Sequence, residues 1–447
     1  MSRRPLPGTF WRLWTASAVS NLGDGMFVIA LPLLATRLTD DPISIGLIAA
    51  FFTIPWLLFA LPVGALIDRS DRRRVMVTAD LCRGALVGGL ALVAAFSDVQ
   101  VWMLWVLAFG LGLGEVFFDS GSQTILPALV PGEQLERANG YLYATEVAAN
   151  TYLGMPLGSV LFAAVVWLPF GVDAVSFVVA ALLAASVRGS YRPATADPRP
   201  RSLAGEVRSG LDWLLHHPLL RALALAVTLM NLAFAATQAT FVLFATRQLH
   251  ISDRSFGPLL AIIGTGSLLA GITGGRIIQA AGRRSTMLAA ALAPALTSAS
   301  IALWPITWLV IAMTTVQAFA TTLWSILAVS LRQQVVPDEL FGRVNSIYRW
   351  LSTGAMPLGA LLGGVLASAY GLRAPYVAAA GLLALASVAI AVTLTTDALS
   401  SSTGAAGIAA MTTNDTTTTN DTTTTNGTLG TDDTPVSLER DPLDELL

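Results

Sequence analysis

The sequence predicts an all-α membrane protein with twelve transmembrane helices in two pseudo-symmetric six-helix bundles. Three observations predict this fold. The 447 residues are 54% hydrophobic and only 12% charged, with a mean hydropathy of +0.66, whereas soluble proteins carry about 25% charged residues. Twelve apolar stretches are each long enough to cross a bilayer, which takes about 20 residues. Finally, sequence motifs of the first half recur in the second.

The composition excludes several classes of protein. A chain so poor in charge cannot cover its surface in water, which argues against a soluble enzyme and against a disordered protein. Lys and Arg together number 26 and Asp and Glu number 28, so no basic field attracts nucleic acid. Cys82 is the only cysteine, and the three histidines fall near segment ends. We therefore expect no disulfide, no metal site and no cofactor.

The apolar segments give the elements in order. The first segment follows Arg3 and Arg4 and is too long for the core of a signal peptide, so we expect no cleaved leader. The predicted spans are 10–37, 43–67, 75–96, 101–122, 138–166, 170–187, 218–246, 256–280, 285–304, 306–332, 343–369 and 372–396.

Polar segments divide the chain into four parts. We predict a six-helix bundle over 1–187, a cytoplasmic linker over 188–217, a second bundle over 218–398 and a tail over 399–447. Within the linker, Leu203, Val207, Leu211 and Leu214 recur at helical spacing, which predicts a short amphipathic helix. The tail is rich in Thr, Asn and Asp, a composition typical of a disordered segment.

The arginines predict the orientation in the membrane. Most arginines before the tail fall in loops on one side of the predicted spans, and only Arg37, Arg247, Arg254 and Arg373 fall on the other. Cytoplasmic loops carry the excess of basic residues. Both termini are therefore expected in the cytoplasm, in the plasma (inner) membrane of a bacterium.

An internal repeat relates the two halves. Residues 131–139 (Pro-Gly-Glu-Gln-Leu-Glu-Arg-Ala-Asn) precede the fifth span, and residues 337–345 (Pro-Asp-Glu-Leu-Phe-Gly-Arg-Val-Asn) precede the eleventh. Both spans then contain Met-Pro-Leu-Gly, at 155–158 and at 356–359. Two parallel six-helix halves suit a transporter that rocks around a central cavity.

These motifs resemble those of the major facilitator superfamily (MFS) of transporters, over roughly residues 9–397. The segment Gly64-x-Leu66-x-Asp68-Arg69-x-x-Arg72-Arg73 is similar to the superfamily's signature between helices 2 and 3, with Asp71 in place of the usual second glycine. Residues 21–25 (Asn-Leu-Gly-Asp-Gly), 125–131 and 342–349 resemble the branch of macrolide and siderophore exporters. The resemblance implies that Asp68, Arg69, Arg72 and Arg73 brace the closed cytoplasmic side against helices 4 and 11.

Several ionisable residues fall inside the predicted spans, where an unpaired charge costs several kcal/mol. One group lies in the cytoplasmic third of the bundle and has both signs: Asp80, Arg83, Glu115, Asp119, Glu146 and Arg349. This group is either a structural ion-pair network or, together with Gly64 and the loop residues, a gate whose pairs change between two states.

Asp24 is placed near the midplane by its position in the first span. A carboxyl group held away from water there can bind and release protons near neutral pH, as proton-coupled transport requires. Asp24 could instead cap a helix break at Gly23 and Gly25, or pair with an arginine. Glu115 and Glu146 are the next candidates for proton coupling.

The segment 154–158 (Gly-Met-Pro-Leu-Gly) is similar to the Gly-Pro motif of MFS antiporters, with an intervening methionine. Its small residues equally predict close helix packing and a kink.

Substrate-facing candidates are Asn231 and Gln238, which share a helix face, and Gln317. Interhelical hydrogen bonds are the alternative role of these amides. No Arg or Lys lies at the midplane to hold a phosphate or carboxylate.

The main hypothesis is a secondary active transporter that exports hydrophobic or amphipathic small molecules, such as a drug, macrolide or siderophore-like metabolite, by proton-coupled alternating access. Its partners would be protons, the substrate and the lipid bilayer, without nucleic acid, and we expect a monomer. One alternative is an importer of a neutral nutrient, because fold does not fix direction. Another is a non-transporting receptor or assembly partner that uses the tail. Neither a nucleophile–base pair nor an ATP-binding loop is present in the sequence, so we do not expect an enzyme.

Overall fold

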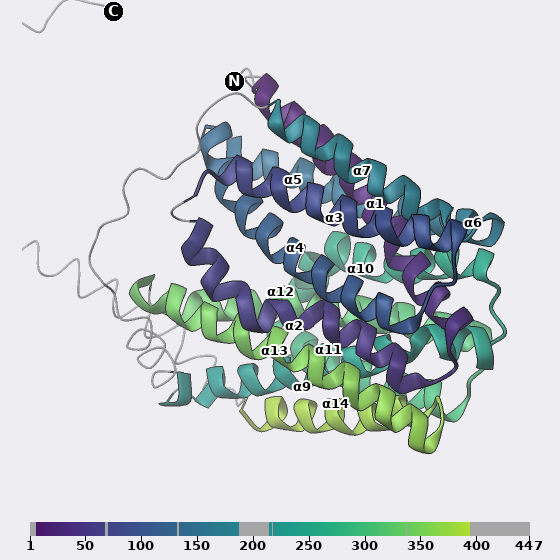
Figure 1. Ribbon diagram of the computed structural model, residues 1–447. Helices are drawn as coiled ribbons and strands as arrows, with labels where there is room; N and C mark the ends of the chain where they lie inside the picture. Colours follow the sequence, from purple (N-terminus) through teal and green to yellow (C-terminus); the bar gives the residue numbers. More distant parts are fainter. Residues whose placement is uncertain are drawn as a thin grey trace, which may run out of the picture. The chain divides into compact units, whose positions relative to one another are not determined.

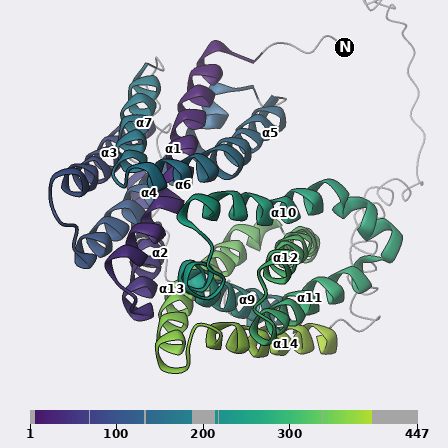
Figure 2. The ribbon, with the colours of Figure 1, turned by 90° about the vertical axis from the view of Figure 1, so that its right-hand side faces the viewer.

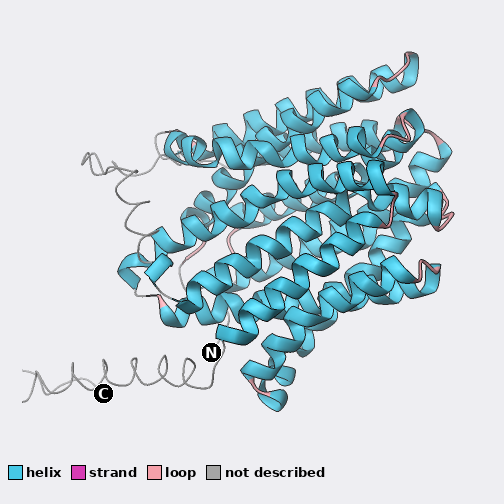
Figure 3. Ribbon diagram, turned by 90° about the horizontal axis from the view of Figure 1, so that it is seen from below, coloured by secondary structure: helices cyan, strands magenta, loops and turns pink. Residues whose placement is uncertain are grey.

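The computed structural model describes residues 6–67, 70–131, 134–186, 214–216, 218–336 and 338–393, and the secondary structure within these ranges is entirely helical (Figure 3). The elements are α1 (Gly8–Leu38), α2 (Pro42–Ile67), α3 (Arg72–Phe96), α4 (Val101–Leu129), α5 (Leu135–Glu146), the π-helix η2 (Val147–Gly154), α6 (Met155–Ala164), α7 (Leu168–Ala185), α9 (Pro218–Leu243), the π-helix η3 (Phe244–Gln248), α10 (Asp253–Ala281), α11 (Arg283–Leu303), α12 (Thr307–Val335), α13 (Asp338–Tyr370) and α14 (Ala374–Thr393).

These helices confirm the prediction of twelve spans. In the described ranges, 12 segments are long and apolar enough to cross a membrane. One span runs through α5, η2 and α6, and another continues from α9 into η3. Large apolar side chains stay exposed on the helix surfaces, such as Leu92 at 63%, Leu182 at 65% and Val392 at 70%. Such a surface fits a hydrocarbon solvent rather than water.

Several helices are longer than the apolar segments that predicted them. α4 continues to Leu129 instead of ending near 122, and α13 begins at Asp338 instead of 343. A helix satisfies its own backbone hydrogen bonds, so its turns continue past the apolar core of the membrane. The predicted amphipathic helix of the linker and the predicted disordered tail fall almost entirely outside the described residues. The division at 187, 217 and 398 therefore stays a prediction.

The helices pack in two groups, the N-terminal half (α1–α7) and the C-terminal half (α9–α14) (Figures 1 and 2). In the N-terminal half, α7 packs on α1 and α3, and α4 packs on α2 and α3. In the C-terminal half, α9 packs on α13 and α14, while α12 packs on α10 and α11. The halves meet along two seams, where α2 lies beside α13 and α6 beside α10.

Glycines permit the close approach of the halves at the α2–α13 seam. A Cβ atom added at Gly46 would lie 2.8 Å from the carbonyl oxygen of Ala360, and one added at Gly364 would lie 2.8 Å from the carbonyl oxygen of Pro42. Both distances are too short for a real contact, so the two backbones can come this close only where no side chain intervenes. The seam is therefore a backbone-to-backbone contact.

Candidate transport cavity and intramembrane charge cluster

The segment 154–158 packs against the middle of α1. A Cβ atom at Gly154 would lie 2.7 Å from the carbonyl oxygen of Leu22, and one at Gly158 would lie 2.6 Å from the Cα atom of Met26. A Cβ atom at Gly25 would in turn overlap the carbonyl oxygen of Asn150 in η2. This contact supports the packing explanation of the segment. A role in antiport stays a prediction.

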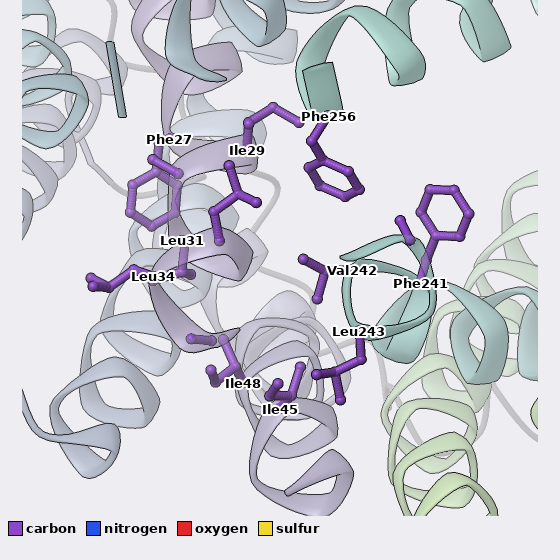
Figure 4. Close-up of a cluster of buried hydrophobic side chains, with 14 of the residues drawn as sticks. Phe27, Ile29, Leu31, Leu34, Ile45, Ile48, Phe241, Val242, Leu243 and Phe256 are labelled. Atoms are coloured by element: carbon purple, nitrogen blue, oxygen red, sulfur yellow. The ribbon is translucent and has the colours of Figure 1, made fainter. Parts of the chain in front are cut away.

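An apolar cluster joins the two halves near the end of α1. We call this end of the bundle, where α1 finishes at Leu38, the Leu38 end. Figure 4 shows side chains of α1 and α2 facing side chains of α9 and α10. The labelled members, all buried, are Phe27, Ile29, Leu31, Leu34, Ile45, Ile48, Phe241, Val242, Leu243 and Phe256. The cluster closes the space between the halves at this end.

Two ion pairs lie beyond the apolar cluster and also link the halves. The Arg37 guanidinium lies 2.7 Å from a carboxylate oxygen of Asp253, and the Arg247 guanidinium lies 2.5 Å from one of Asp40. Arg247 also donates a hydrogen bond of 3.0 Å to the carbonyl oxygen of Thr36. Two of the four arginines that departed from the positive-inside pattern, Arg37 and Arg247, therefore contact the opposite half.

A cavity of about 310 Å³ lies between the halves, next to the apolar cluster. Residues of α1, α2, α9 and α13 line it, and none of them is charged. Gln238 contributes an amide and Thr53 a hydroxyl, whereas Val28 and Phe234 are among the apolar residues. Such a lining suits a hydrophobic or amphipathic molecule with few polar groups.

The structure separates the three amides that were predicted to face substrate. Gln238 lines the cavity. Asn231 donates a hydrogen bond of 3.1 Å to the carbonyl oxygen of Ser352 in α13, which favours the interhelical role. Gln317 is half-buried in α12 and is not part of the lining of this cavity.

Arg83 lies at the centre of a group of carboxylates in the N-terminal half. Its guanidinium is 2.7 Å from Asp80 and the two side chains are only 6% and 1% exposed. The ring centroids of Phe118 and Phe177 lie 4.8 Å and 4.4 Å from the guanidinium carbon. Gly114 leaves room for the aliphatic part of Arg83, because a Cβ atom there would lie 2.6 Å from its Cγ. The cation is therefore held by one ion pair and two aromatic faces.

Three more carboxyl groups surround this pair. Asp24 of α1 and Glu115 of α4 interact electrostatically with Arg83, and so does Asp173 of α7. Ser20 lies 3.4 Å from Asp24 and donates to its Oδ2 atom. We refer to the set as the Arg83 cluster, and its members are Asp24, Asp80, Arg83, Glu115 and Asp173.

The sequence placed Asp24 apart from the cytoplasmic-third charges, but in the structure it shares Arg83 with them. The sequence placed Asp24 near the midplane from its position in the predicted span 10–37. With 31 residues, α1 is about 46 Å long at 1.5 Å per residue, which exceeds a core of about 30 Å. Part of α1 therefore lies outside the core, and the midplane position of Asp24 stays a prediction. Asp119 and Glu146 lie at the margin of the cluster, where both interact with Glu115.

The connection between α2 and α3 is only partly described. Asp71 caps α3 by accepting hydrogen bonds from the backbone N–H groups of Arg73 and Arg74. Arg73 also donates to the carbonyl oxygen of Ala185 at 3.5 Å, and Arg12 donates to that of Ser186 at 2.9 Å. Arg72 is half-buried at the start of α3.

The remaining gating candidates cannot be placed in the same way. Asp68 and Arg69 lie outside the described residues. Gly64 lies in α2 and Arg349 in α13, but the side-chain contacts of these two residues lie outside the described part of the structure. The bracing role of all these residues stays a prediction.

Sequence reasoning missed Asp173 and the ion pairs of Asp40 with Arg247 and of Asp253 with Arg37. Asp173 lies only five residues from the start of α7, so it resembled a residue at the membrane surface. An aspartate inside an apolar span could nevertheless have been recognised as a candidate functional residue, because a charge there is costly.

In the described part of the chain, no three His, Cys, Asp or Glu side chains form a group that could hold a metal ion.

Comparison with known proteins identifies the family. Residues 4–414 match the transmembrane secretion effector family. Macrolide efflux protein A of Streptococcus pyogenes is 26% identical over 379 residues, which cover 81% of this chain and 90% of that protein. The multidrug efflux pump Tap of Mycolicibacterium fortuitum is 27% identical over 378 residues, with the same coverage of 81% and 90%.

Solved structures agree with this assignment at the level of the fold. A bacterial homologue of the iron transporter ferroportin in its inward-facing state has a TM-score of 0.68 at 17% identity, covering 87% of this chain and 98% of that one. The nucleoside transporter NupG has a TM-score of 0.69 at 12% identity, covering 86% and 99%. The protein is thus a multi-pass membrane transporter of small molecules rather than an enzyme. It belongs to the transmembrane secretion effector family of the major facilitator superfamily.

Proposed function

We propose that this protein exports hydrophobic or amphipathic small molecules from a bacterial cell, driven by protons that enter in exchange. The named relatives are efflux proteins for macrolides or for several drugs. The chain would lie in the plasma membrane as a monomer, with both termini in the cytoplasm and the Leu38 end outside.

One observation carries the proposal: an uncharged cavity between the halves lies beside a buried charge cluster. Val28 lines the cavity, and Asp24 of the Arg83 cluster lies one turn before it on α1. Residues four apart share a helix face. A change of charge at Asp24 can therefore alter the position of the helix that borders the substrate.

The exchange would couple the two sites through α1. When Asp24 is ionised, its attraction to Arg83 holds α1 against α3. Substrate bound in the cavity draws α1 away, the Leu38 end opens and substrate leaves to the outside. Asp24 then takes up a proton from outside, which prevents its attraction to Arg83. After the Leu38 end closes again, this proton is released to the cytoplasm, which returns Asp24 to Arg83. Glu115 and Glu146 are the next groups on this route.

The opposite end of the bundle would close when the Leu38 end opens. We propose that Gly64, Asp68, Arg69, Arg72 and Arg73 then brace that end against helices of both halves. Asp80, Arg83, Asp119 and Arg349 would exchange partners during the same movement.

The experiment measures accumulation of a lipophilic cationic dye and of a macrolide in an efflux-deficient bacterial host. Cells carry the intact chain, Asp24→Asn or no transporter, each with and without a protonophore. We expect the intact chain to lower accumulation of at least one compound, and the protonophore or Asp24→Asn to abolish this effect. An effect that survives the protonophore would refute proton coupling. Equal accumulation in all cells, with the protein present in the membrane, would refute export of these compounds.

A further inference from the structure

Asp173 is the most deeply buried carboxyl group of the Arg83 cluster. It lies in α7 and is 0% exposed. Ser176, one turn later, donates a hydrogen bond of 3.2 Å to its Oδ1 atom. Its Oδ2 atom has no hydrogen-bond partner among the described residues. An ionised carboxylate in this position would lack much of the solvation that it has in water.

Asp173 points toward the contact between α1 and α7. A Cβ atom at Gly23 of α1 would overlap both Asp173 Oδ1 and the Ser176 hydroxyl. The absence of a side chain at Gly23 is therefore what allows α1 to cover Asp173. Asp24 is the next residue after Gly23. The same turn of α1 therefore covers the Asp173 carboxyl group and bears the Asp24 carboxyl group.

The charged groups that face Asp173 come from two of the helices packed on α7. Asp24 faces it from α1, and Asp80 and Arg83 face it from α3. The third such helix, α6, contains no titratable side chain between Met155 and Ala164.

A count of charges then limits the state of this group. Arg83 is the single cation of the Arg83 cluster, and Asp80 already makes an ion pair with it. If Asp24, Glu115 and Asp173 were ionised as well, three uncompensated negative charges would lie together in a low-dielectric interior. Such a state is strongly unfavourable, so the cluster must bind protons. The least exposed member with an unpartnered oxygen is the natural place for one of them.

We propose that Asp173 is a second proton-binding group of the transport cycle and carries a proton while the Leu38 end is closed. The proposal rests on the proton-driven export proposed above. When α1 moves away from α7 at Gly23 and the Leu38 end opens, the Asp173 carboxylate takes up a proton from water that enters from outside. After this end closes again, the O–H bond of Asp173 breaks and its proton passes through the Asp24 carboxylate to the cytoplasm. The Asp173 carboxylate that remains is stabilised by Arg83. Two carboxyl groups thus share one fixed cation, and more than one proton can move for each substrate.

The test compares exchange with driven transport in proteoliposomes that contain the purified full chain. The substrate is a radiolabelled macrolide that the intact chain transports. Exchange of labelled for unlabelled macrolide at equal pH requires movement of the loaded carrier but no net transfer of protons. Accumulation driven by a pH gradient requires movement of the carrier and also net transfer of protons. Asp173→Asn imitates a permanently protonated carboxyl group, and Asp98→Asn, in the exposed connection before α4, is the matched control.

We expect Asp173→Asn to keep exchange and to lose accumulation driven by the pH gradient, while Asp98→Asn keeps both. Driven accumulation equal to that of the intact chain would overturn the role of Asp173 and leave the proposed function standing. Loss of exchange together with driven accumulation in a folded variant would also overturn it, because it would mark Asp173 as structural. Absence of driven transport in the intact chain would instead be a failure of the proposed function.

If Asp173→Asn does not fold, a second measurement tests whether Asp173 binds a proton. Proton release on addition of macrolide is followed with a pH indicator in weakly buffered detergent solution, for the intact chain and for Asp24→Asn. With Asp173 as a second site, Asp24→Asn releases fewer protons than the intact chain but still some, and this remainder persists when Glu115→Gln and Glu146→Gln are added. Complete loss of release in Asp24→Asn would overturn the proposal.

Discussion

Replacing Arg247 by alanine should shift the proposed equilibrium toward opening of the Leu38 end. The variant loses two contacts between the halves. One is the ion pair with Asp40, whose side chains are 52% and 75% exposed, so it contributes at most about 0.5 kcal/mol. The other is the hydrogen bond of 3.0 Å to the carbonyl oxygen of the buried Thr36. Because its donor is charged, this bond contributes about 1.5 kcal/mol.

The two contributions sum to about 2 kcal/mol, which corresponds to a change of about thirtyfold in the ratio of closed to open protein. Spin labels on cysteines introduced at Ile43 in α2 and Ser255 in α10, both exposed positions on opposite halves, report the separation by pulsed electron resonance. Cys82 is exposed and is replaced by serine beforehand. The longer-distance population should rise in Arg247→Ala.

Arg254→Ala is the matched control, since it removes another exposed arginine from the same end. It should leave the distance distribution as in the intact chain. An unchanged distribution in Arg247→Ala would refute the inference that these contacts hold the end closed. An equal shift in both variants would show that total charge at this end, rather than the specific contacts, controls closure.

Three further predictions concern other parts of the molecule. Gln238→Leu removes the amide from the cavity, and a substrate that hydrogen-bonds to it should lose about 1 kcal/mol of binding, measured as a higher Kd. Gly154→Ala should lower the melting temperature in detergent, because its Cβ would lie 2.7 Å from the Leu22 carbonyl oxygen; Gly140→Ala, with open space around it, should not. Hydrogen bonds from Ser44 hold the pKa of Asp41 below its ordinary 3.8, so Asp41 stabilises the start of α2 at neutral pH and loses this effect as the pH falls through its folded-state pKa. The difference in melting temperature between the intact chain and Asp41→Ala should therefore narrow in acid, and a constant difference would refute this role.

The number and order of the helices could be predicted from the sequence because the membrane imposes one strong physical rule. A span needs a minimum apolar length, and each of the twelve segments meets it. Helix ends were less accurate, as with α4 and α13, because hydropathy reports the membrane and not the hydrogen bonds that continue a helix. The π-helix η2 was not predicted at all. It lies at the contact of Gly25 with Asn150, which joins residues far apart in the sequence.

The candidate site was predictable in composition more than in arrangement. Asp24, Arg83 and Glu115 were selected because charge inside a membrane is costly, and the structure brings them together. The grouping depended on how far α1 extends beyond the membrane, which hydropathy does not measure. Asp173 was overlooked because it lies close to the start of its predicted span, 170–187. Its burial results from the packing of α1 at Gly23.

The lining of the cavity and the Arg83 cluster draw on almost separate sets of helices. The cavity uses α1, α2, α9 and α13, whereas the cluster uses α1, α3, α4 and α7. Only α1 belongs to both. Under the proposed function, selection for a new drug can reshape α2, α9 and α13 without disturbing proton coupling at the Arg83 cluster, so variants with altered resistance profiles should concentrate there. A substitution in α1 has no such freedom, because it changes recognition and coupling at once.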